Sequence, residues 1–254
     1  MRISELTEEL EPAFWKHVSQ DPLDYCFFIL DLRRRREKTQ VFLALEKQEI
    51  CGLMLIYDNE IVQLRGAPES YPSLLSKLGK SKVQITAPMS SKQVLTSLYP
   101  AATLQENLML MRLEKLNKPI KMTRGIKNLE PDASAEIASL MQRTNPVWWG
   151  EITSSDVRKS FGDSFWLGIR KAGSLVAVGE ARDLEVGGHV VIAATDERSR
   201  NKGYATSIVS ALVKRLLKTA KVVLIFVLEG NLAAVHAYEK VGFSPYRCYF
   251  VLRT

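Results

Sequence analysis

The apolar residues of this chain fall into short runs and helical stripes that alternate from one end to the other. A short apolar run between polar turns predicts a strand, and apolar residues three and four positions apart predict a helix. In the first half, the pattern predicts helices over 6–18, 23–32, 70–78 and 91–98, and strands over 41–45, 50–57, 60–65, 83–86 and 104–113. Alternation of this kind is typical of an α/β protein.

The second half begins the same order again. It predicts strands over 165–170, 175–181, 186–194 and 222–228, and helices over 131–143 and 154–161, directly after Gly203, and between Asn231 and Gly242. Residues 144–151, with two adjacent tryptophans, are expected to form a loop. The repeated order indicates an internal duplication. Because the polar stretch 115–123 follows neither period, we expect two domains, 1–117 and 122–254, with a boundary near Asn117.

One part of the second half predicts a parallel strand pair. The strand that ends at Ala194 leads into a polar turn and then into a helix with one apolar face, and 222–228 follows as seven consecutive apolar residues. A continuous apolar run is typical of a strand buried on both faces, and a strand, a helix and a strand in this order form a parallel crossover. Ligands of such sheets bind at the carboxyl ends of the strands. A binding site is therefore expected just after Ala194.

Composition excludes several classes of protein. Apolar residues make up 46% of the chain and charged residues 25%, and no apolar run approaches the roughly 20 residues that span a bilayer. The first residues lack the basic start and apolar run of a signal peptide, so we expect a cytoplasmic protein. Three cysteines and three histidines lie far apart, which argues against a disulfide framework or a metal site.

The formal charge of +7 favours an anionic partner, such as nucleic acid, an anionic membrane surface or a small polyphosphate. The densest positive run is Arg33–Arg36, at the end of a predicted helix. Cations stabilise the negative pole of a helix, so a solvated helix end is the favoured interpretation. A nucleic-acid patch is the alternative, but the run has little of the aromatic interleaving that would support it.

The turn after Ala194 has the features of a phosphate cradle. Arg200, Gly203 and Ala205 form R-x-x-G-x-A directly before an amphipathic helix. The first N–H groups of a helix have no intrahelical partner and the helix dipole is positive there, so they can converge on an anion. The absence of a side chain at Gly203 lets a pyrophosphate approach the backbone. The alternative is an ordinary strand-to-helix turn that binds nothing.

Two motifs carry a resemblance to a known family. Arg200–Thr206 resembles the acyl-CoA loop of GCN5-related N-acetyltransferases (GNAT), Q/R-x-x-G-x-G/A, and Asn231–Phe243 matches their second signature, N-x-x-A-x-x-x-Y-x-x-x-G-F. The resemblance covers about 122–254, with a weaker likeness over the first half. It implies an α/β fold of tandem GNAT-like units. Each would have a mixed, mostly antiparallel sheet flanked by helices, with a central parallel β-α-β in the C-terminal unit.

The resemblance also implies residue roles, with acetyl-CoA as cosubstrate and no metal. The backbone of 192–195 would pair with the pantetheine arm, and 200–206 would bind the pyrophosphate. Cofactor binding is thereby assigned to Ile192, Ala193, Ala194, Thr195, Arg200, Asn201, Lys202, Gly203, Tyr204, Ala205, Thr206, Asn231, Ala234 and Tyr238. Tyr238 would also protonate the departing thiolate as a general acid. The alternative for Tyr238 is packing under the last strand.

The remaining catalytic assignment is the general base. Glu180, Glu185 and His189 are the candidates, no motif decides among them, and each could instead be structural; we select Glu180. In the first half, 64–70 stands where a phosphate loop would be. Pro68 lacks an N–H donor and Glu69 repels phosphate, so the first domain is expected not to bind coenzyme A (CoA). It would be a scaffold or one wall of the acceptor site.

The sequence thus predicts an N-acetyltransferase that moves an acetyl group from acetyl-CoA to a primary amine. The amine belongs to a small molecule, a peptide or a protein, and no motif selects one. A non-catalytic CoA-binding sensor or interaction module is the alternative, and nucleic-acid binding ranks last. No membrane partner is expected, and a homodimer is compatible with the sequence.

Overall fold

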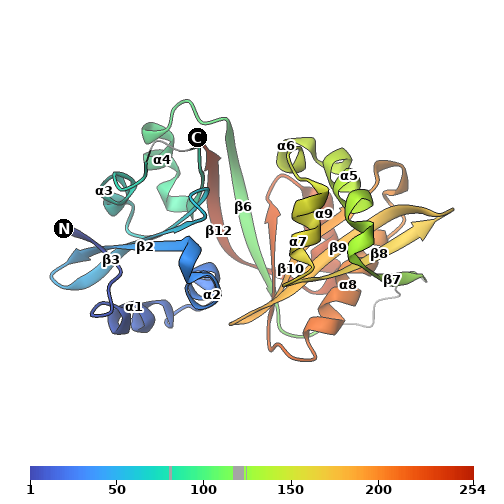
Figure 1. Ribbon diagram of the computed structural model, residues 1–254, viewed down its shortest axis with the longest axis horizontal. Coiled ribbons are helices and arrows are strands. Elements are labelled where there is room, and N and C mark those ends of the chain that lie inside the picture. The colour runs from blue at the N-terminus through green and yellow to red at the C-terminus, as the bar shows by residue number, and fades with distance from the viewer. Residues whose placement is uncertain (80–81, 117–122, 124) are drawn as a thin grey trace. The chain divides into compact units, whose positions relative to one another are not determined.

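The computed structural model describes residues 1–79, 82–116, 123 and 125–254. The chain forms two compact units (Figure 1). The first unit comprises Met1–Met109, Leu228–Gly230 and Arg247–Thr254, and the second comprises Leu110–Val227 and Asn231–Tyr246. The boundary expected near Asn117 and the expected domain start at 122 lie outside the described residues. This division differs from the expected domains 1–117 and 122–254, because the end of the chain belongs to the first unit.

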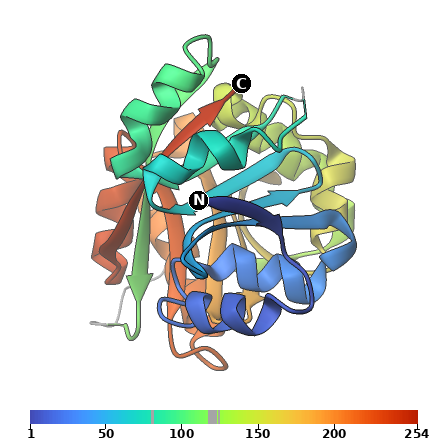
Figure 2. The same cartoon turned by 90° about the vertical axis from the view of Figure 1, so that its left-hand side faces the viewer.

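The first unit has a mostly antiparallel sheet. Its strand order is β1 (Arg2–Glu5), β2 (Thr39–Glu46), β3 (Glu49–Tyr57), β4 (Ile61–Gly66), β5 (Gln84–Pro88) and β12 (Ser244–Arg253). Only β4 and β5 are parallel among these neighbours. Helices α1 (Glu11–Val18) and α2 (Cys26–Arg34) lie on one side of the strands, and α3 (Tyr71–Leu75) and α4 (Lys92–Leu98) lie on the other (Figure 2).

The second unit repeats this arrangement. Its strand order is β11 (Val223–Leu228), β10 (Gly187–Thr195), β9 (Ser174–Leu184), β8 (Phe165–Lys171) and β7 (Ile126–Leu129). Its helices are α5 (Ser134–Thr144), α6 (Pro146–Trp149), α7 (Ser154–Ser160), α8 (Tyr204–Leu216) and α9 (Leu232–Val241). Only β10 and β11 are parallel, and α8 connects them. Strand β6 (Leu104–Leu113) contributes residues to both units.

The alternating pattern of strands β9 and β10 explains the layers of the second unit. Ile192 and Ala194 pack into one core with Ile137 of α5. Gly179 faces the opposite side, where a Cβ would meet the Ile208 side chain of α8 at 2.4 Å. Because successive residues of a strand point to opposite faces, α5 and α8 cover opposite faces of this sheet.

The structure confirms the expected fold class and the parallel crossover. It adds three strands that the pattern did not predict, β1, β7 and β12, and it places the short helix α6 within the expected loop 144–151. The run Arg33–Arg36 ends α2, where Arg35 pairs with Asp31 at 3.4 Å and Arg36 with Glu11 at 2.6 Å. No helix in the described part of the chain is long and apolar enough to cross a membrane.

Candidate functional site

The two parallel strands of the second unit separate where the site is expected. Their ladder joins Gly188 to Val223, His189 to Leu224 and Val190 to Ile225, and it ends there. At the same point, the pairing of β10 with β9 shifts register between Val190 and Ile192, which marks a β-bulge. Both strands continue beyond the ladder, so a gap opens between them towards their carboxyl ends.

The hydrogen bonds of β10 show which backbone groups face this gap. The Asp196 N–H donates to the Val176 carbonyl at 2.9 Å, on the β9 side. Alternate residues of a strand direct their N–H and C=O groups to opposite edges, so Ile192 and Ala194 face β9 as well. Ala193 and Thr195 therefore present their backbone to the gap. Of the four residues assigned to the pantetheine arm, these two direct their backbone N–H and C=O groups towards the gap, as pairing with the arm requires.

The loop after β10 ends at the open start of α8. Gly203 is the N-cap residue and has φ +75°, a left-handed conformation that favours glycine. A Cβ at this position would meet no atom within 4 Å, so the space beside it is open. The N–H groups of Tyr204, Ala205 and Thr206 form the first turn, where a helix offers no intrahelical acceptor. This geometry suits an anion.

Cationic side chains flank the loop. The Arg200 guanidinium is half exposed, 3.7 Å from the Glu197 carboxylate and 3.4 Å from the Thr144 carbonyl at the end of α5. The Lys202 ammonium lies 3.4 Å from the Arg198 carbonyl. Asn201, between the two cations, has φ +62° and completes the tight turn before Gly203. The loop therefore combines positive charge with open N–H groups.

One buried polar atom points to a missing partner. The hydroxyl oxygen of Thr195 is buried and has no hydrogen-bond partner among the described residues. Leaving a buried hydroxyl without a partner costs roughly 1–3 kcal/mol. Thr195 is the last residue of β10, directly before the loop. A cofactor that pairs with this strand end would remove the cost, so the residues present fit a phosphate-bearing thioester such as acetyl-CoA.

The second motif forms helix α9 as the sequence predicts. The Asn231 side chain accepts the Ala234 N–H at 3.2 Å, and Gly242 ends the helix at φ +114°. With its oxygen engaged as the N-cap, Asn231 keeps its amide N–H groups for a ligand. Ala234, one helical turn before Tyr238, is a small residue on the same face.

Tyr238 is buried, with 5% of its surface exposed, and its ring packs edge-on against Phe243 at 6.2 Å. Burial raises the pKa of Tyr238 to about 12. The phenol is therefore protonated at neutral pH, which is the state that a general acid needs.

Glu180 occupies a different environment. It is 4% exposed on β9, and burial raises the pKa of its carboxyl, against hydrogen bonds from Ser164 and Ser160 and the charge of Arg182. Ser160 ends α7 and Ser164 precedes β8, so these hydrogen bonds hold the carboxylate on the β8 side of β9. In the described part of the chain, no hydrogen bond is seen between Glu180 and Tyr238, which lie on β9 and α9.

The other two candidate bases differ in position. His189 is buried in the middle one of the three residue pairs that join β10 to β11. Its ring lies edge-on to Phe226 of β11 at 5.6 Å. Burial, together with the charge of Arg182, lowers its pKa well below the ordinary value, so the imidazole is neutral at pH 7. Glu185 is exposed in the turn before β10, at the opposite end of that strand from Thr195. His189 is thus the candidate beside the start of the gap.

Two structural features of the site have no motif in the sequence. The bulge at β10 opens the gap, but its residues are ordinary strand formers. Asp196 fixes the loop: its carboxylate accepts the Arg198 N–H at 3.1 Å and lies 3.7 Å from Arg143 of α5. An aspartate at the end of a strand is a frequent turn residue, which is the only signal that the sequence offers. The described residues include no cluster of three or more side chains suited to bind a metal.

The fold and the site define an α/β protein with an open helix start beside a split parallel strand pair. Comparison with protein families identifies this class: residues 134–243 match the model of the Acetyltransferase (GNAT) family. The resemblance to the GNAT superfamily is thereby confirmed. No curated protein matches the sequence.

Solved structures extend the likeness in fold to the whole chain. A Drosophila protein has a TM-score of 0.74 at 10% identity, covering 99% of this chain and 98% of its own. A tandem GNAT protein from the clavulanic acid biosynthesis pathway has a TM-score of 0.63 at 10% identity, covering 100% and 98%. A GNAT-family acetyltransferase from Colwellia psychrerythraea has a TM-score of 0.60 at 12% identity, covering 100% and 99%. These similarities support the tandem fold.

Proposed function

We propose that the second unit transfers an acetyl group from acetyl-CoA to a primary amine. The observation that carries this proposal is the end of the β10–β11 ladder at Val190, directly before a strand end with an unpartnered Thr195 hydroxyl and an open helix start at Gly203. Backbone groups of Ala193 and Thr195 would bind the pantetheine arm, and the loop 200–206 would hold the pyrophosphate. Asn231 would reach the pantetheine from the start of α9.

The reaction needs one bond to form and one to break. The neutral amine nitrogen attacks the thioester carbon, a C–N bond forms, and the C–S bond breaks to release the CoA thiolate. Tyr238 gives its proton to the thiolate, and a base accepts the proton that the amine nitrogen loses. The phenolate then takes back a proton from solvent. The products are the amide and free CoA.

We assign the base to Glu180, because its raised pKa makes its carboxylate a stronger base than an exposed one. Glu180 would act through water, since its carboxylate is held on the β8 side of β9. The amine acceptor belongs to a small molecule, a peptide or a protein. A cytoplasmic location is a part of this proposal that rests on the sequence, and a homodimer is compatible with it.

The test is calorimetry with CoA, followed by thiol release from acetyl-CoA over a panel of amines. Binding of CoA to wild type, together with amine-dependent thiol release, is the expected result. Absence of binding would contradict the proposal.

A second candidate is a CoA-binding sensor without turnover. The separation of Glu180 from Tyr238 favours it, because a catalyst needs both an acid and a base within reach of the reacting atoms. Binding of CoA without thiol release on any amine, including peptides, would support the sensor and refute the transferase.

A further inference from the structure

The first unit repeats the strand separation of the second. Its parallel ladder joins Ile61 to Gln84, Val62 to Ile85 and Gln63 to Thr86, and it ends there. Strand β4 continues to Gly66 and β5 to Pro88. The length of this ladder, three pairs, equals that of β10 and β11. The first unit thus has the kind of strand end at which the second unit would hold its cofactor.

A buried arginine occupies this strand end. Val62 and Leu64 of β4 pack with Tyr71 and Leu74 of α3, so Arg65 points to the opposite face, towards α1 and α2. Only 2% of its side chain is exposed.

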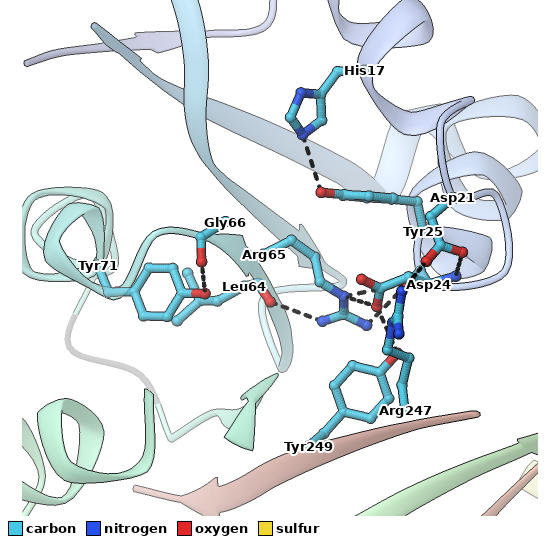
Figure 3. Close-up of polar contacts among 10 residues, drawn as sticks. All are labelled: His17, Asp21, Asp24, Tyr25, Leu64, Arg65, Gly66, Tyr71, Arg247 and Tyr249. Carbon is cyan, nitrogen blue, oxygen red and sulfur yellow. Dashed lines mark hydrogen bonds and ion pairs between the residues drawn. The ribbon is translucent and has the colours of Figure 1, made fainter. Parts of the chain in front are cut away.

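Each part of the Arg65 guanidinium has an acceptor (Figure 3). Its Nε donates to the Asp24 carboxylate at 2.6 Å, and Nη2 donates to the Asp24 carbonyl at 3.1 Å. Its Nη1 donates to the Leu64 carbonyl at 2.8 Å. Asp24 lies in the turn between α1 and α2, so this cluster joins the turn to β4.

The last strand of the chain completes the cluster. Tyr249 of β12 donates its hydroxyl to the Asp24 carboxylate at 2.6 Å, and its ring lies 4.4 Å from the guanidinium carbon of Arg65 (Figure 3). Tyr249 is 1% exposed, and β12 pairs with β5 from Tyr249 to Arg253. One carboxylate therefore receives hydrogen bonds from β4 and from the C-terminal strand.

The cluster pairs one positive charge, on Arg65, with one negative charge, on Asp24. Burial alone would lower the pKa of Arg65, but the paired Asp24 carboxylate opposes this effect and the pKa lies above the ordinary value, so the guanidinium stays charged. Burial raises the pKa of the Tyr249 phenol, against the effect of Arg65, so its hydroxyl stays a donor. A buried charge that loses its partner is strongly destabilising.

We propose that Asp24, Arg65 and Tyr249 form an internal plug that fills the strand end of the first unit and locks the chain's last strand into it. The plug replaces a ligand by side chains of the protein itself. Two consequences follow: the first unit does not hold CoA, and its stability depends on residues beyond Tyr246. The plug goes beyond the function proposed for the second unit and does not depend on it.

Hydrogen exchange of the full chain tests the lock. Tyr249→Phe keeps the ring and removes only the hydroxyl that reaches Asp24. We expect exchange of amides in α2, β4 and the end of β12 to accelerate about 10- to 100-fold, the range for one hydrogen bond to a charged group. Exchange in α8 and β9 should stay unchanged.

Arg247→Ala is the matched control, because Arg247 lies on the same strand and its half-exposed side chain forms an ion pair with Asp21 at 2.8 Å. We expect less than a fivefold change, as for other exposed pairs. Equal effects of Tyr249→Phe and Arg247→Ala would overturn the lock.

A double-mutant cycle tests the buried pair. Arg65→Met should lower the urea midpoint of the first unit, followed through exchange of β4, because it leaves the Asp24 carboxylate without its counter-ion. Arg65→Met combined with Asp24→Leu should recover part of that loss, since no uncompensated charge remains. If the losses of urea midpoint caused by Arg65→Met and by Asp24→Leu simply add in the double variant, the result would contradict the plug.

CoA stoichiometry tests the occupied strand end. Wild type is expected to bind at most one CoA per chain, and two would overturn the plug. Absence of all CoA binding would contradict the function proposed for the second unit. The plug would then still be tested by the hydrogen exchange of Tyr249→Phe and Arg247→Ala.

Discussion

Replacement of Gly203 by alanine separates the binding role of this glycine from its backbone role. Gly203 has φ +75°, and a Cβ there would meet no protein atom within 4 Å. The protein itself therefore has room for the methyl group, and the cost to folding is conformational. An L-residue in the left-handed region costs roughly 1–2 kcal/mol, offset by the lower entropy of alanine in the unfolded chain. We expect a net loss of about 1 kcal/mol and a Tm lower by roughly 2–4 °C.

The loss of cofactor affinity should be larger. In the proposed complex the pyrophosphate occupies the open space beside Gly203, where the alanine methyl would extend. Displacing one hydrogen bond to a charged phosphate costs roughly 1.5–3 kcal/mol, which is about a 10- to 100-fold rise in Kd. Isothermal titration of CoA into Gly203→Ala and wild type measures this rise directly.

Gly173→Ala is the matched control for the Gly203 variant. Gly173 has φ +83°, and its Cβ would also meet no atom within 4 Å. It lies in the turn between β8 and β9, outside the proposed cofactor loop. Both variants should lose similar stability, but only Gly203→Ala should lose affinity for CoA. Equal affinities of the two variants would refute the assignment of the loop 200–206 to the pyrophosphate.

Three further predictions concern the proposed chemistry. Tyr238→Phe should lower kcat at least about 100-fold, the usual contribution of a general acid, with the CoA Kd changed less than twofold; an unchanged kcat would remove Tyr238 from the mechanism. Glu180→Gln should lower kcat. It should also abolish the rise of kcat that wild type is expected to show as pH increases through the raised pKa of Glu180. Because the folded pKa is raised, wild type should also lose unfolding free energy as pH rises through it, and the glutamine variant should lack this loss. Asn231→Ala should cost about 1 kcal/mol of stability in urea unfolding as the N-cap is lost, whereas Asn231→Asp keeps the cap and should not.

The elements with strong local signals could be predicted from the sequence. Strand β6 spans the predicted residues, Leu104–Leu113, because its apolar residues lie between polar turns. Helix α9 begins at the Asn231 cap and ends at Gly242, because both residues have local conformational preferences that need no tertiary partner. The apolar face of α8 is buried as its spacing predicts.

Features that depend on distant partners could not be predicted. The first residues of β12 are mostly exposed, and its partner β5 lies more than 150 positions earlier, so no local pattern marks this pairing. The plug joins residues 24, 65 and 249, which the sequence presents as unrelated polar residues. The bulge in β10 likewise depends on its register with β9. For Gly203 the sequence indicated only the need for a small residue, and the structure adds the left-handed backbone.

The two units differ at the strand end where we propose that the second unit binds an anion. In the second unit, a bulge precedes the loop, and α8 runs for 13 residues from an open glycine cap. In the first unit, β4 pairs with β3 in regular register up to Gly66.

A 3₁₀ turn that begins at Pro68 follows β4, and α3 has only 5 residues. Pro68 has no N–H to offer, Glu69 adds a negative charge, and so short a helix has a weak dipole. These differences disfavour phosphate independently of Arg65. A strand end that binds no anion needs another occupant, and a buried, ion-paired arginine is a stable one only where an acceptor such as Asp24 can match its charge. The Arg65 plug and the altered loop therefore support the same proposal, that the first unit does not bind the cofactor and attaches the chain's own last strand at this place.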